Sequence, residues 1–203
     1  MGVHGMVASG HPLASAAALD VLKDGGNAVD AALCASGVLS VVKSYHCGLG
    51  GDVFGIFYSA KERRVVVLNG SGLPPRLLRR EAYSGSIPHR GILAASTPGA
   101  LDAWFEAASK LGSRAVRDLL KPAIEYAENG FPVFPHLAKV IRSSHRALSA
   151  DPARAAIFLP DGKAPEVGDL LVQKDLAATL RDIANGGRES FYTGDIVSHA
   201  DDM

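Results

Sequence analysis

The glycine-rich stretch from Gly48 to Gly55 is the first place where residue types and spacing could support chemistry. A phosphate-binding loop needs the spacing GxxxxGK[ST] after a strand. This stretch lacks the lysine and the hydroxyl, and it follows a segment expected to be helical. A dinucleotide-binding turn must also follow a strand, so the same context excludes it. We therefore interpret Gly48, Gly50, Gly51 and Asp52 as a structural turn, in which glycine permits close backbone packing.

Histidine and cysteine side chains are the next candidates, because they are common metal ligands. His46 and Cys47 are adjacent and Asp52 is nearby, but the ligands of one ion need a spacing that lets their side chains converge. The other six histidines form no HxH or HExxH pattern. The sequence therefore predicts no metal site and no cofactor.

A catalytic nucleophile is equally hard to find from residue types. No GxSxG pattern marks a serine on a sharp strand-to-helix turn. Serine, histidine and aspartate are frequent enough that a triad can be assembled on paper, so composition alone does not indicate one. From the residues we predict no catalytic side chain and can name no reaction.

Charge and hydropathy exclude two classes of partner. Lys plus Arg equals Asp plus Glu, at 21 each, so no overall field favours nucleic acid or an anionic membrane. We interpret the basic run Arg76–Arg80 as a solvated turn.

The sequence has no run of ~18 apolar residues and does not open on a signal-peptide pattern, which predicts a cytoplasmic protein. Cys34 and Cys47 form no disulfide framework, and Cys34 is expected to be a buried neutral thiol.

The first elements are predicted from helix signals. Residues 3–9 are expected to form a short strand, and Pro12 to open a helix over 13–24 that ends at Gly25-Gly26. Asn27 is the expected N-cap of a helix over 28–42. That second helix is apolar on all sides, which is typical of a helix buried on every side.

A hairpin and several helices complete the prediction. The hairpin has strands at 56–58 and 64–68, followed by a loop over 69–75, and a short strand is expected at 92–95. The expected helices span 100–111, 114–128, 136–148 and 174–183, with Gly186-Gly187 as the last stop. Because regular βαβ alternation is missing, we predict an α+β fold with a mixed sheet flanked by helices, in a single or partial domain over 1–203.

Several stretches resemble the γ-glutamyltranspeptidase family, and they occur in the family's order along almost the whole chain. The most specific is LKDGGNAVDAA at Leu22–Ala32. The others are Met6–Ser9 with His11–Ala14, Gly48–Asp52, Thr97–Gly99, Leu120–Phe131, Gly168–Asp169 with Gln173, and Phe191–Gly194.

The resemblance implies part of an αββα N-terminal-nucleophile hydrolase that is made as a self-cleaving precursor. In such enzymes a new amino-terminal Thr is the nucleophile and its own α-amino group is the base. That Thr begins a small subunit downstream of the matched motifs, so we expect this chain to be a large-subunit portion with no catalytic residue and no activity alone. Its expected partners are the small-subunit segment and a small-molecule amide substrate, with homo-oligomers possible.

One departure from the family bears on the substrate. Typical members carry an Arg in the loop after the hairpin, where it grips the substrate α-carboxylate. Here the loop has Asn69, Gly70 and Ser71, with Gly70 nearest the Arg position, and we expect these three residues to bind substrate. The variant resembles the transpeptidase-like and oxamate-amidohydrolase-like branch, and Gly70→Arg is expected to restore some preference for γ-glutamyl substrates. Alternatively, an arginine at position 76, 79 or 90 reaches the pocket.

Two other classes stay open at this point. The chain could be a non-catalytic scaffold or binding protein, or one half of a two-chain heteromer. Because the apolar helix over 28–42 and the sheet both need cover, we expect the chain alone to expose a large apolar patch and to associate.

Overall fold

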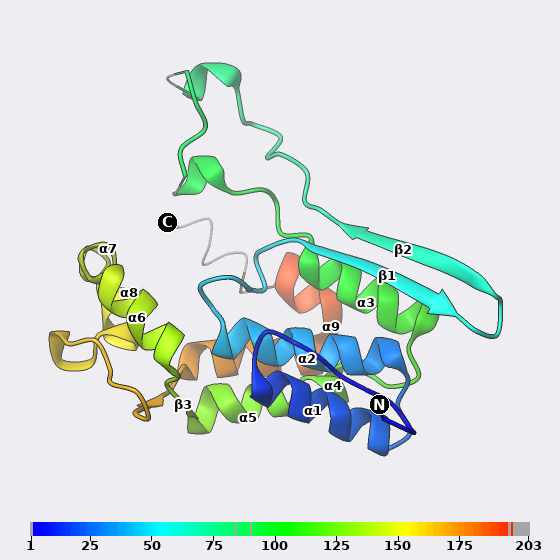
Figure 1. Cartoon of the computed structure of the whole chain (residues 1–203). Coiled ribbons are helices and arrows are strands. Elements are labelled where there is room, and N and C mark those ends of the chain that lie inside the picture. The colour runs from blue at the N-terminus through cyan, green and yellow to red at the C-terminus, as the bar shows by residue number, and fades with distance from the viewer. Residues whose placement is uncertain (1, 84, 90, 195, 197–203) are drawn as a thin grey trace. The chain divides into compact units, whose positions relative to one another are not determined.

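The computed structural model describes residues 2–83, 85–89, 91–194 and 196 (Figure 1). The chain divides into two compact units. We call residues 1–48 with 112–203 the helical unit, and residues 49–111 the hairpin unit. Each is described by itself.

Helix α1 spans Pro12–Lys23 and opens the helical unit. Its N-cap is His11, whose Nδ1 accepts a hydrogen bond from the Leu13 backbone N–H at 3.2 Å. The helix ends before Gly25, which has a φ of 82° that glycine adopts at little cost. The expected start and stop are confirmed. The strand expected over 3–9 does not form, because no strand in the part of the chain that the structure describes pairs with that backbone.

Helix α2 spans Ala28–Val42, as predicted, and packs against α1 and against α5 (Lys121–Asn129). Asn27 caps it, with its Oδ1 accepting the backbone N–H groups of Val29 and Asp30. Eleven of its fifteen residues are buried, including Val38, Val41 and Val42. A helix whose surface is apolar on all sides is expected to be buried in this way.

Further helices build the rest of this unit around a core that includes Phe131, Leu137 and Leu180. They are α4 (Val116–Leu119), α5, α6 (Pro135–Ser143), α7 (His145–Ser149), α8 (Pro152–Phe158) and α9 (Lys174–Tyr192), with a 3₁₀ turn at Pro160–Gly162. Strands β3 (Phe131–Pro132) and β4 (Leu170–Leu171) pair antiparallel.

Three of the expected helices have different bounds. The helix expected over 114–128 is divided into α4 and α5, because Pro122 lacks the N–H that would continue the ladder. The helix expected over 136–148 is divided into α6 and α7 at Ser144. Helix α9 continues past the expected stop to Tyr192, with a kink where Gly187 has a φ of 70°.

The hairpin unit consists of strands β1 (Val53–Ser59) and β2 (Arg64–Gly70) and helix α3 (Ala100–Leu111). The strands pair antiparallel from Val53 opposite Gly70 to Ser59 opposite Arg64. The strand expected over 92–95 is instead a 3₁₀ turn at Ile92–Ala94, since its N–H groups bond within the turn. A second 3₁₀ turn lies at Arg80–Ala82.

The two faces of the hairpin differ in exposure. One face packs against α3, whereas the other carries five large apolar side chains that are at least 58% exposed: Phe54, Ile56, Tyr58, Val65 and Val67. The register places Tyr58 opposite Val65 and Ile56 opposite Val67, so these side chains form one continuous apolar face. The expected uncovered apolar patch is therefore confirmed, and association of the chain stays a prediction.

Candidate substrate loop and the residues that hold it

The first turn of α3 is bonded to the glycine-rich turn of the same unit. The backbone N–H groups of Gly99 and Ala100 both donate to the carbonyl oxygen of Gly51, at 3.1 and 2.9 Å. These are N–H groups that a helix leaves without an intrahelical partner. The turn therefore fixes where α3 begins.

The segment Gly70–Gly72 lies directly against the segment Thr97–Gly99. The Thr97 N–H donates to the Leu73 carbonyl at 2.9 Å. A Cβ atom at Gly72 would lie 1.6 Å from the Thr97 carbonyl oxygen, and one at Gly99 would lie 2.5 Å from the Gly70 carbonyl oxygen. Two backbones approach this closely only where a side chain is missing, so the glycines at both positions are required.

Asp52 joins the same cluster through its side chain. Its Oδ1 accepts a hydrogen bond from the Gly72 backbone N–H at 2.8 Å and one from the Ser96 hydroxyl at 3.3 Å. The carboxylate is exposed. Of the four residues expected to form the structural turn, Gly51 and Asp52 make these bonds, whereas Gly48 and Gly50 have no atom closer than 4.0 Å to an added Cβ.

The three residues expected to bind substrate differ in whether their side chains are exposed. Asn69 and Ser71 are exposed, and the Asn69 Oδ1 accepts the Ser71 backbone N–H at 3.0 Å. Gly70 is the buried last residue of β2 rather than part of a loop. An added Cβ there would lie 2.5 Å from the Ala103 Cβ and 2.9 Å from the Val53 Cγ1. This geometry argues against the Gly70→Arg expectation, because an arginine at this position would displace α3 or β1.

Asp30 is a buried carboxylate in the helical unit. Its full set of hydrogen-bond partners was not predicted from the sequence. It accepts hydrogen bonds from the N–H groups of Asn27 (2.8 Å), Ser113 (2.9 Å) and Arg114 (3.2 Å), and from the Ser113 hydroxyl (2.6 Å). Burial acts to raise the pKa of Asp30, but these hydrogen bonds outweigh it and hold the pKa below its ordinary value. The Asn27–Asp30 spacing of a capping box was the available signal.

Two further side chains that could do chemistry, His11 and Cys34, are buried. Burial, and then the nearby Lys43, lower the pKa of His11, which favours the neutral imidazole. The ring packs edge-on against Phe134 with the ring centroids 4.6 Å apart. Burial raises the pKa of the Cys34 thiol to about 11, which confirms a buried neutral thiol. Within the described residues, no three His, Cys, Asp or Glu side chains are grouped to hold a metal ion.

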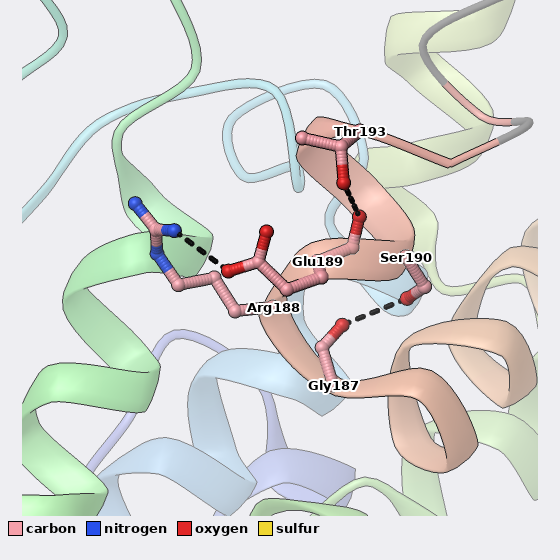
Figure 2. Close-up of polar contacts among 5 residues, drawn as sticks. All are labelled: Gly187, Arg188, Glu189, Ser190 and Thr193. Atoms are coloured by element: carbon pink, nitrogen blue, oxygen red, sulfur yellow. Dashed lines mark hydrogen bonds and ion pairs between the residues drawn. The ribbon is translucent and has the colours of Figure 1, made fainter.

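The three threonines of the chain differ in how they are held. The hydroxyl of Thr179 donates to the Asp175 carbonyl at 3.0 Å. The hydroxyl of Thr193 donates to the Glu189 carbonyl, also at 3.0 Å (Figure 2). The Ser190 hydroxyl donates to the Gly187 carbonyl at 2.7 Å, so the Ser190 and Thr193 hydroxyls each bond a backbone carbonyl at the C-terminal end of α9 (Figure 2). Thr97 lies at an exposed position before α3.

Comparison with known proteins decides the family. The profile of the γ-glutamyltranspeptidase family matches residues 14–201. The chain belongs to the γ-glutamyltranspeptidase family. It is 42% identical to the glutathione hydrolase-like YwrD proenzyme of Bacillus subtilis over 98% of this chain and 39% of that protein. It is 38% identical to the oxamate amidohydrolase proenzyme of Klebsiella pneumoniae over 97% of this chain and 39% of that protein.

Solved structures confirm the predicted fold class. The crystal structure of Helicobacter pylori γ-glutamyltranspeptidase matches with a TM-score of 0.89 and 30% identity, over 97% of this chain and 58% of that chain. The α+β class, as part of an N-terminal-nucleophile hydrolase fold, is therefore confirmed. The expected mixed sheet is not found among the described residues, whose two sheets are each two-stranded and antiparallel. The chain corresponds to the large-subunit region of the family and spans 39% of the length of the two proenzymes above. Within the described residues, no helix has both the length and the hydropathy to cross a membrane.

Proposed function

We propose that these 203 residues form the scaffold and substrate-side part of an amidohydrolase whose Thr nucleophile lies in a downstream small-subunit segment. The observation that carries the proposal is the family match over residues 14–201, together with relatives that are proenzymes more than twice as long. In this proposal the chain alone is inactive, forms one partial domain of the complete enzyme, and needs no cofactor. The cytoplasm is its proposed compartment.

The proposed substrate is a small amide. Positions 69–72 are Asn, Gly, Ser and Gly, so this segment has no guanidinium that could bind a substrate α-carboxylate. The exposed Asn69 and Ser71 side chains offer an amide and a hydroxyl instead, which suit neutral hydrogen-bonding groups. The relative named an oxamate amidohydrolase supports the same substrate class.

The proposal is tested on the full-length protein, by which we mean the product of the complete reading frame that contains these residues. Assayed with oxamate and with γ-glutamyl-p-nitroanilide, it is expected to hydrolyse the small amide with the higher kcat/KM. A scaffold without a catalytic partner would hydrolyse neither. A two-chain heteromer would become active only when a second gene is expressed with this one. Faster turnover of the γ-glutamyl substrate would contradict the proposed substrate class.

Ser71→Ala is expected to raise KM for the small amide about tenfold in the full-length protein, because one hydrogen bond to the substrate is lost. Ser109→Ala, which also removes an exposed hydroxyl of the hairpin unit, serves as the control and should leave KM within about twofold. Equal KM values for the two variants would remove Ser71 from the substrate site.

A further inference from the structure

We propose that Asp52 is the positioning residue that holds the substrate loop, residues 71–73, in place. The inference rests on the proposed function, in which Asn69 and Ser71 contact the substrate. Asp52 directly precedes β1, and its carboxylate Oδ1 bonds both to the Gly72 N–H and to the Ser96 hydroxyl. One oxygen atom thereby ties together three segments that are 20 and 44 residues apart in sequence.

The loop has few other restraints at this point. The ladder between β1 and β2 ends with Val53 opposite Gly70, so the strands do not hold the residues after Gly70. The next backbone bond of this segment is from the Thr97 N–H to the Leu73 carbonyl. Between these two points, the Ser71 N–H bonds only locally, to Asn69. The bond from Gly72 to Asp52 therefore joins residues 71–73, which lie beyond the ladder, to the residue that precedes β1.

The chemistry of the bond suits a positioning role. A carboxylate accepts hydrogen bonds from backbone N–H groups more strongly than a neutral oxygen does. Because a Cβ at Gly72 would collide with the Thr97 carbonyl, the backbone at Gly72 has little room to move toward Thr97. Asp52 restrains it through the Gly72 N–H. Ser71, the neighbour of Gly72, is then presented in one orientation, which reduces the entropy lost on binding.

The test compares Asp52→Ala and Asp52→Asn in the full-length protein. Asp52→Ala is expected to raise KM for the small amide about tenfold while kcat stays within about twofold, because the loop loses its restraint. Asp52→Asn is expected to recover most of the affinity, since its amide oxygen accepts the same two bonds. Asp169→Ala is the matched control. The Asp169 carboxylate is also exposed and accepts a backbone N–H at 2.8 Å, from Glu166 in the helical unit.

A second readout does not depend on activity. In hydrogen exchange, a peptide that spans residues 69–75 reports on residues 71–73, because the first two residues of a peptide do not retain deuterium, and Pro74 and Pro75 have no amide hydrogen. Asp52→Ala should exchange there at least about tenfold faster than the wild type, and Asp52→Asn should not. If the full-length protein hydrolyses no amide, the proposed function fails, and this exchange result still decides whether Asp52 holds the loop.

Three results would overturn the inference. The first is unchanged exchange at residues 71–73 in Asp52→Ala. The second is a fall of kcat without a rise of KM, which would place Asp52 at the reacting atoms rather than behind the loop. The third result applies if Asp52→Ala does not fold, in which case Asp52→Asn is measured alone and should keep a wild-type KM. A tenfold rise of KM in Asp52→Asn would show that the charge of Asp52 matters, and not the hydrogen bond.

Discussion

Gly72→Ala is expected to lower the free energy of unfolding by about 3 kcal/mol, because it overpacks a site with no free volume. The added Cβ would lie 1.6 Å from the Thr97 carbonyl oxygen, which belongs to the backbone and cannot rotate away. Relief requires separating residues 71–73 from the segment before α3, which breaks the bond from Thr97 to Leu73 and one of the two bonds that Asp52 accepts, from Gly72 or from Ser96.

Urea unfolding of the full-length protein, followed by circular dichroism, measures this loss. Gly48→Ala is the matched control, since no atom lies within 4 Å of a Cβ built there. It should change the free energy of unfolding by less than about 0.5 kcal/mol. A Gly72→Ala variant as stable as Gly48→Ala would show that the two segments are not held together as the structure describes.

Asp30→Ala is the second substitution with a large expected effect, a loss of about 3 kcal/mol or more. The carboxylate accepts four hydrogen bonds, so its removal leaves the N–H groups of Asn27, Ser113 and Arg114 without this acceptor. Buried donors without a partner are costly. Asp20→Ala is the control, because the Asp20 side chain forms an exposed ion pair with Lys23, and such a pair contributes less than about 1 kcal/mol.

The contribution of Asp30 also has a defined pH dependence. Its pKa in the folded protein lies below the ordinary value of 3.8. A lowered pKa means that the unfolded chain binds the proton first on acidification, so the stabilisation is present above 3.8 and is lost as the pH falls toward the folded pKa. Urea unfolding should therefore show that the difference in the free energy of unfolding between wild type and Asp30→Ala becomes smaller below about pH 4. A difference that stays constant on acidification would show that the pKa of Asp30 is not lowered.

Local signals in the sequence were sufficient for the helices that begin and end at strong caps. His11-Pro12, Gly25-Gly26 and Asn27 determine α1 and α2 through short-range bonds, and their bounds could be predicted. The strands expected over 3–9 and 92–95 were wrong because a strand exists only when another strand pairs with it. Residue types alone do not show whether such a partner is present.

The candidate site was less accessible to prediction because it depends on contacts between distant segments. The glycine-rich composition indicated a close approach, but not that Gly72 approaches Thr97 or that Asp52 bonds to Ser96, 44 residues away. Asn69 and Ser71 were named from the family resemblance. That Gly70 has no room for a side chain depends on Ala103 in α3 and Val53 in β1, and this became visible only in the folded unit.

The position of the mature amino terminus tests the central claim most directly. The full-length protein is purified, and its fragments are identified by intact mass and amino-terminal sequencing. We predict two fragments, of which the larger contains these 203 residues and the smaller begins with a Thr that lies downstream of them. A single uncleaved chain, or cleavage that exposes Thr97, Thr179 or Thr193 as the new amino terminus, would contradict the assignment of this chain to the part without the nucleophile.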